Sequence, residues 1–252
     1  MSTNSMISTS AVTLGASLML AVAGSGEVPV NLQWRPATQV VATARTVRVA
    51  LYAVSADPEQ AQSIAAADVI VQWDPARLEL VGVEDPPVPD WLFSGFASDP
   101  YGLNEAFPPA DGDAMYTVLA PLGEQVLAPP EGLLLTTFVF HTTEQTGVAI
   151  VHIAASAGDP PGQTRVFSGD TPNTVITGTL GDATVEIVCA TCPGDLTGDD
   201  LVALDDLVVL LAHYGMNDGA GPDDGDFDCD GDVDAADLAI LLMRYGQWCS
   251  DG

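Results

Sequence analysis

Between residues 28 and 188, apolar and polar positions alternate in short runs. Alternation with a period of two is typical of strands that bury one face. The runs are Val47–Val54, Ala67–Trp73, Leu78–Val83, Ala114–Ala120, Leu133–Phe140, Val148–Ile153 and Thr184–Val188. Clusters of Asp, Pro and Gly separate most of them, and no long helical pattern intervenes. The pattern predicts an all-β sandwich of the jelly-roll kind over residues 27–188.

The pattern changes in residues 189–252, where a short acidic loop followed by an apolar run occurs twice. The copies, Asp195–Gly215 and Asp226–Gly246, are offset by 31 residues throughout. The apolar runs predict helices over Leu204–Tyr214 and Ala235–Tyr245, each ended by the glycine that follows. Turn-forming residues precede both loops, so each unit is a loop with one exiting helix. The sequence therefore predicts a small all-α module after the sandwich.

The two acidic loops have the ligand spacing of a calcium site. Calcium takes oxygen ligands at loop positions 1, 3, 5 and 12 and a backbone carbonyl at position 7. In loop one, residues 195–206, the candidate ligands are Asp195, Thr197, Asp199, Leu201 and Asp206. In loop two, residues 226–237, they are Asp226, Asp228, Asp230, Asp232, Asp234 and Asp237. The alternative is a solvated acidic linker, but scattered carboxylates would not keep one spacing twice.

Loop two is predicted to bind Ca²⁺ more tightly than loop one. Loop one has the neutral Thr197 at position 3, and Ala203 at position 9 offers no side-chain ligand. Position 6 needs a sharp turn, for which loop two has Gly231 and loop one has Asp200. Asp tolerates a left-handed backbone, so the turn still forms at some cost. We predict two Ca²⁺ sites, the second stronger.

The helices are apolar around most of their circumference. In the first, Leu207, Leu210, Leu211 and Tyr214 are predicted to pack on one side, which leaves Val208 and Val209 to be covered. In the second helix, Ala239, Ile240 and Met243 likewise remain to be covered. The cover is expected from a partner or from the sandwich.

The repeat resembles a dockerin module, the calcium-dependent adaptor of cellulosome-type assemblies. The resemblance lies in the two D-x-(D/T)-x-D loops, the Val202/Val233 pair at position 8 and the Asp206/Asp237 pair at position 12. It implies a cohesin-like or other extracellular protein domain as partner. In many dockerins, hydroxyl residues at the loop–helix junction read the partner. Here the junctions are Leu204-Asp205 and Ala235-Ala236, so the identity of the partner does not carry over.

The sandwich also resembles a known superfamily, that of cohesin and carbohydrate-binding domains. The matching stretch is Ala67–Glu84, in which a strand ends in Trp73-Asp74-Pro75 and precedes Leu80-Val-Gly-Val83. The resemblance implies a cohesin-like jelly roll.

A turn-rich stretch carries five aromatic residues, Trp91, Phe93, Phe96, Tyr101 and Phe107. They form either a platform for sugar rings or a loop that packs its own aromatics onto the sheet.

Composition narrows the class of partner and the compartment. The formal net charge is −29, with 35 acids against six Arg and no Lys, and residues 193–252 hold 15 of the acids. This charge argues against nucleic acid and anionic membrane surfaces as partners.

Residues 1–26 are predicted to be a signal peptide or a disordered leader. Ala11–Ala23 is apolar, ends in a small-x-small site and is too short to span a membrane, but no basic residue precedes it.

All four cysteines, Cys189, Cys192, Cys229 and Cys249, lie in or beside the repeat. Two disulfides are predicted in a secreted protein, with half a zinc site or a redox pair as the alternative for Cys189 and Cys192. If the helices are antiparallel, the start and end of the module meet. Cys249 would then pair with Cys192 or Cys189, and the remaining cysteine with Cys229.

These observations predict a secreted, non-catalytic adaptor that binds calcium and mediates protein–protein assembly in a polysaccharide-associated extracellular context. The alternative is a carbohydrate-binding domain with a calcium-stabilised C-terminal anchor, for which polysaccharide is the partner. No Ser/His/Asp arrangement, phosphate loop or fixed pair of acids points to an enzyme.

Overall fold

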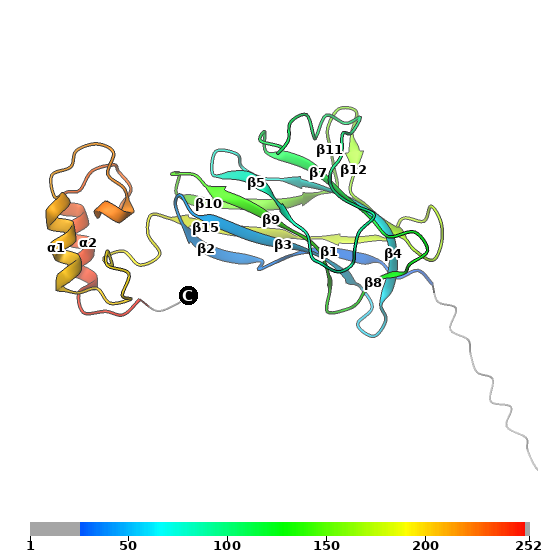
Figure 1. Ribbon diagram of the computed structural model, residues 1–252, viewed down its shortest axis with the longest axis horizontal. Helices are drawn as coiled ribbons and strands as arrows, with labels where there is room; N and C mark the ends of the chain where they lie inside the picture. The colour runs from blue at the N-terminus through cyan, green and yellow to red at the C-terminus, as the bar shows by residue number, and fades with distance from the viewer. Residues whose placement is uncertain (1–25, 250–252) are drawn as a thin grey trace, which may run out of the picture.

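The chain folds into a β-sandwich followed by a two-helix module (Figure 1). The computed structural model describes residues 26–249, so the predicted leader lies outside the described residues apart from Gly26. The first sheet has the order β14 (Thr177–Leu180), β1 (Val30–Arg35), β3 (Thr46–Ser55), β9 (Leu133–Thr142), β5 (Leu78–Glu84). The second has the order β2 (Thr38–Ala42), β15 (Asp182–Val188), β10 (Gly147–Ala154), β4 (Gln62–Gln72), β7 (Asp113–Leu119), β6 (Phe93–Phe96).

Short strands complete the second sheet. Both β8 (Val126–Ala128) and β13 (Arg165–Ser168) pair with β4, while β11 (Ser156–Ala157) and β12 (Gly162–Gln163) form a separate hairpin. Most neighbours are antiparallel, but β1 pairs with β14 and β2 with β15 in parallel. The predicted sandwich is confirmed, and all seven predicted strands are present with ends shifted by a few residues.

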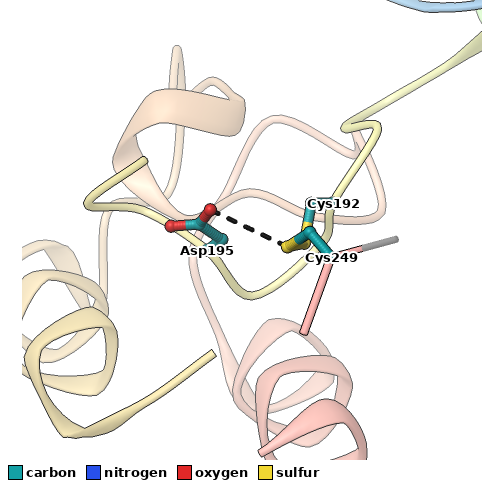
Figure 2. A group of neighbouring side chains, drawn as sticks. All are labelled: Cys192, Asp195 and Cys249. Atoms are coloured by element: carbon teal, nitrogen blue, oxygen red, sulfur yellow. Dashed lines mark hydrogen bonds between the residues drawn. A yellow bond between two sulfur atoms is a disulfide. The ribbon is translucent and has the colours of Figure 1, made fainter. Parts of the chain in front are cut away.

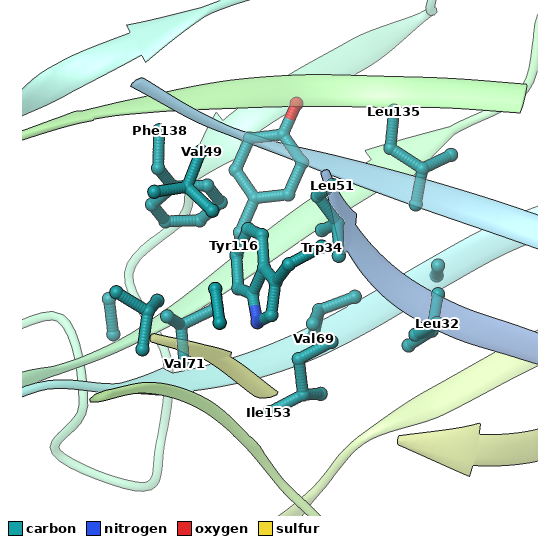
Figure 3. Packing of buried hydrophobic residues seen from close by; sticks show 14 of the residues in the cluster. Leu32, Trp34, Val49, Leu51, Val69, Val71, Tyr116, Leu135, Phe138 and Ile153 are labelled. Carbon is teal, nitrogen blue, oxygen red and sulfur yellow. The ribbon is translucent and has the colours of Figure 1, made fainter. Parts of the chain in front are cut away.

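The core lies between the sheets, where alternate residues of facing strands meet. In β3 the buried positions include Val47, Val49 and Leu51, as the period-two pattern requires. Phe138 is at the centre: its ring lies 5.3 Å from that of Trp34 and 5.7 Å from that of Tyr116, both edge-on (Figure 3). Such contacts favour one packing arrangement over other apolar arrangements of similar volume.

A second, smaller core lies outside the second sheet. Ile70 of β4 and Met115 of β7 are buried there beneath Leu103, with Tyr101 packed against them. The aromatic stretch therefore acts mainly as cover: Trp91 and Phe96 pack on the main core and Tyr101 on the small one, while Phe93 and Phe107 are exposed. The packing interpretation is borne out for three of the five residues, and the five do not form a common exposed platform.

The module contains α1 (Leu204–His213), the 3-10 turn η1 (Pro222–Asp224) and α2 (Ala235–Arg244). The helices are antiparallel neighbours (Figure 1). They enclose a small core of Val202, Leu210, Phe227, Val233 and Leu241. Among the described residues, no helix is long and apolar enough to cross a membrane.

The predicted helices are confirmed, but the predicted packing of the first is wrong in part. Leu210 is fully buried, whereas Leu211 and Tyr214 are 53% and 47% exposed. Each helix contributes one fully buried apolar residue to the module core, Leu210 and Leu241, with Leu207, Leu238 and Ile240 partly buried against it.

Candidate metal centre

The position-12 aspartates, Asp206 and Asp237, join the start of each loop to the start of its helix. Both are fully buried. Asp206 accepts hydrogen bonds from the backbone N–H of Leu196 (2.8 Å) and Ala203 (2.7 Å). Asp237 accepts the equivalent bonds from Phe227 (2.7 Å) and Asp234 (2.8 Å). An anionic group in the first turn of a helix is also favoured by the helix dipole.

The position-1 aspartates, Asp195 and Asp226, fold each loop around themselves. One carboxylate oxygen of Asp195 accepts from the backbone N–H of Asp200 at 3.0 Å, and the matching oxygen of Asp226 accepts from Gly231 at 3.0 Å. Asp200 has φ +65° and Gly231 has φ +93°. The prediction that Asp200 supports the same left-handed turn without glycine is confirmed.

Carboxylates converge in each loop. The oxygens of Asp195, Asp199 and Asp206 lie within 4.8 Å of one another in loop one, and those of Asp226, Asp228 and Asp237 do so in loop two. Asp232, Asp234 and Asp237 form a further trio within the same distance.

The remaining predicted ligands lie beside these trios. Thr197 donates its hydroxyl hydrogen to Asp206 at 3.1 Å. Asp230 accepts from the backbone N–H of Asp232, and Asp199 accepts from that of Leu201. Leu201 and Asp232 stand at position 7, where a backbone carbonyl is the expected ligand. Asp232 also has a buried side-chain oxygen without a hydrogen-bond partner in the described chain.

The electrostatics of loop two suit a divalent cation. Burial, followed by repulsion from the carboxylates of Asp237 and Asp230, raises the pKa of Asp228. Burial, followed by the carboxylates of Asp230 and Asp234, also raises the pKa of Asp232. A bound cation of charge two would relieve this repulsion. The donors are all hard oxygens, so the residues present fit Ca²⁺.

In loop one, burial and hydrogen bonding act in opposite directions on the pKa of the position-12 carboxylate. Burial alone would raise the pKa of Asp206, but the backbone N–H donors of Ala203, Thr197 and Leu196 outweigh it, and the pKa is lowered. Its central carboxylate is thus held in the charged form chiefly by hydrogen bonds, with fewer acids around it than in loop two.

The two units are tied together by backbone pairing that repeats with the sequence. Val202, at position 8 of loop one, exchanges hydrogen bonds with Gly246 (2.8 Å) and Gln247 (3.0 Å), which follow α2. Val233, at position 8 of loop two, pairs with Gly215 (2.8 Å) and Met216 (2.9 Å), which follow α1. Each loop therefore rests on the end of the other unit's helix, and the units are related by a pseudo-two-fold axis.

Two disulfides close the module, Cys189–Cys229 and Cys192–Cys249. The predicted pairing of Cys249 with Cys192 or Cys189 and of the remaining cysteine with Cys229 is confirmed. The antiparallel helices bring the start of the module to its end, as that prediction required. Figure 2 shows the second bridge beside Asp195, with Cys249 Sγ 3.7 Å from a carboxylate oxygen. Because both sulfurs are bonded, neither offers a thiolate to a metal.

No protein-family model matches the chain, and no curated protein matches it in sequence. Among solved structures, it is similar to the seventh ScaB type I cohesin from Pseudobacteroides cellulosolvens, with 14% identity, 64% of this chain and 93% of that chain covered, and a TM-score of 0.45. It is also similar to the sixth cohesin from scaffoldin B of Acetivibrio cellulolyticus, solved with a Cel5 dockerin, with 13% identity, coverages of 64% and 99%, and a TM-score of 0.45.

Proposed function

We propose that the protein is a secreted, non-catalytic adaptor whose C-terminal module binds two Ca²⁺ ions and docks on another extracellular protein domain. The sandwich is the second part of the adaptor, a cohesin-like assembly domain acting in a polysaccharide-associated setting. The observation that carries the proposal is an exposed apolar stripe along α1.

The stripe consists of Leu204, Val208, Leu211 and Tyr214, which are 63%, 60%, 53% and 47% exposed. Leu204, Val208 and Leu211 lie on one side of α1, about 120° around the helix axis from the buried Leu210, and Tyr214 directly follows the end of the helix. An exposed apolar patch with a polar rim is characteristic of a protein interaction site. The module that carries the stripe is strongly acidic, with 15 acids and one Arg in residues 193–252, so the partner is expected to offer an apolar surface with a neutral or basic edge.

The α2 face is less suited to the same role. The positions equivalent to Leu204 and Val208 are Ala235 and Ala239, which present less apolar surface. Leu242 and Tyr245 remain exposed at the other end of α2. The pseudo-two-fold axis therefore relates two unequal faces, and α1 is the stronger docking element.

Calcium is expected to control docking because loop one and the stripe share a helix. Asp206 lies in the first turn of α1, between Leu204 and Val208. Metal bound by Asp195, Asp199 and Asp206 would hold this turn in place. Without metal, repulsion among the carboxylates opposes the fold, and metal affinity at such a site is folding free energy. The disulfides fit an oxidising, extracellular compartment.

The test combines calcium titration with affinity capture. The purified full chain is first titrated with Ca²⁺ by calorimetry and is expected to bind two ions. Immobilised full chain is then exposed to the secreted proteins of its source, with calcium or with chelator. We expect capture that requires calcium and is lost in Val208→Asp.

Val148→Asp is the matched control, because Val148 is 57% exposed on the sandwich. It should capture as the wild type does. If no captured protein requires both calcium and Val208, or if Val208→Asp and Val148→Asp affect the calcium-dependent capture equally, docking through α1 is contradicted.

A further inference from the structure

We propose that each disulfide of the module positions one calcium loop: Cys189–Cys229 holds loop two, and Cys192–Cys249 holds loop one. This inference rests on the proposed calcium binding and adds residues that are not themselves ligands. It assigns the two bridges separate tasks, whereas a general cross-link would stabilise both loops together.

The first bridge acts on the turn of loop two. Cys229 stands at position 4 and has φ +59°, a left-handed conformation that side-chain-bearing residues rarely adopt. The equivalent residue of loop one is Gly198, with φ +74°, which takes this conformation readily. Loop two thus needs something to hold its position 4, and the bond to Cys189 supplies it.

The same bridge also reaches position 1 of loop two. Cys189 is 8% exposed, and its sulfur lies 3.2 Å from the carbonyl oxygen of Asp226. Cys189 directly follows the last residue of β15, Val188. The bridge therefore anchors positions 1 and 4 of loop two to the end of a sandwich strand.

The second bridge holds loop one at its start and at its central turn. The carbonyl of Cys192 accepts from the N–H of Asp195, at position 1, at 3.2 Å. The N–H of Cys249 donates to the carbonyl of Asp200, at position 6, at 2.8 Å. Trp248 forms a β-bridge with Leu201 at position 7. The bond between Cys192 and Cys249 thus holds the first ligand of loop one against its left-handed turn, where glycine is missing.

The separation of tasks is visible in the contacts. The backbone hydrogen bonds of Cys192 and Cys249 to a calcium loop, and the Cys249 sulfur contact, are to loop one, whereas Cys229 belongs to loop two and Cys189 Sγ touches Asp226. Removing one bridge should therefore weaken one calcium site more than the other.

The test uses the full oxidised chain and two double variants, Cys189→Ser/Cys229→Ser and Cys192→Ser/Cys249→Ser. Ca²⁺ is titrated while the backbone amide resonances of Gly198 and Gly231 are followed by NMR. Each glycine reports on its own loop, because its N–H donates to the position-1 aspartate of that loop. Each double variant is expected to lose about tenfold in affinity at its own loop and no more than about threefold at the other.

A third variant, Cys189→Ser/Cys229→Gly, separates the covalent tether from the backbone conformation. Glycine should recover about fivefold of the affinity lost with serine at position 229, the equivalent of about 1 kcal/mol. If a serine pair does not fold even at millimolar calcium, the other double variant, which keeps only the bridge in question, is loaded with calcium, and the two glycine amides are compared before and after a phosphine reduces that bridge.

Equal losses at both loops, or no loss at either, would overturn the assignment of one bridge to each loop. So would a glycine variant that binds no better than the serine variant. Oxidised wild type that binds no Ca²⁺ at all would instead refute the proposed function.

Discussion

Replacing Gly231 by alanine measures what the sharp turn of loop two contributes. Gly231 has φ +93°, and its N–H donates to Asp226 at 3.0 Å. A Cβ added there meets nothing within 4 Å, so no clash contributes to the effect. The left-handed backbone alone costs a residue with a side chain about 1–2 kcal/mol. Alanine also restricts the unfolded chain, which offsets about 0.4–1 kcal/mol. We expect the calcium-loaded module to lose about 1 kcal/mol of unfolding free energy.

The assay is denaturant unfolding at saturating calcium, followed through the amide resonances of residues 226–237, together with a calcium titration. If the metal-free loop relaxes out of the turn, the cost of alanine falls on the calcium-bound state alone and appears as weaker calcium binding. If the metal-free loop keeps the turn, the cost is the same with and without calcium and appears only as a lower free energy of unfolding. Gly123→Ala is the matched control: its φ is +80°, its Cβ also meets nothing within 4 Å, and it lies in the sandwich. It should leave loop two unchanged. A Gly231→Ala protein that matches the wild type in both measurements would refute the reasoning.

Phe138→Ala, at the fully buried centre of the aromatic cluster, should cost the sandwich about 3–5 kcal/mol in denaturant unfolding and leave calcium affinity unchanged. Chelating calcium should remove hydrogen-exchange protection from α1 and α2 but not from β3 and β9; protected helices would contradict metal-dependent folding. Asp226→Ala should lower the total calcium affinity measured by calorimetry more than Asp195→Ala does, because loop two has more carboxylates; equal losses would count against this ranking.

The strands were predictable because each sandwich strand buries alternate residues, a pattern readable within a few positions. Their pairing was not. The neighbours β3 and β9 lie about 80 residues apart in sequence, and a local pattern does not say which strand will lie alongside. The strand β1 was missed although Val30, Leu32 and Trp34 alternate, because the run is short and ends at Arg35-Pro36.

The small outer core is reflected in the sequence of β4. In Val69-Ile70-Val71 every position is apolar, which is typical of a strand covered on both faces. Ile70 is indeed buried by Leu103, from a loop 33 residues away in sequence. Which loop provides the cover depends on tertiary packing, so a strand pattern alone could not name it.

The geometry of the two acidic loops was more predictable than the sandwich. Their candidate ligands lie within 12 consecutive residues, and the loop geometry follows from the positions of Asp and Gly along the chain. The disulfide pairing needed one tertiary assumption, antiparallel helices, which the structure bears out. The sequence did not predict the backbone hydrogen bonds between each loop and the end of the opposite helix, because they join residues well separated in sequence, such as Val202 and Gly246.

The position of β15 has a mechanical consequence. It is the last strand, it is hydrogen-bonded along its length to β2 on one side and β10 on the other, and it leads directly into Cys189. Under the proposed docking, tension applied to the helices reaches the sandwich through Val188, along the direction of the strand. The bonds of both ladders then share the load in shear and do not open one after another. Because Cys229 is tied back to Cys189 and Cys249 to Cys192, the module has little slack to release under load, and it should extend little before the sandwich itself yields.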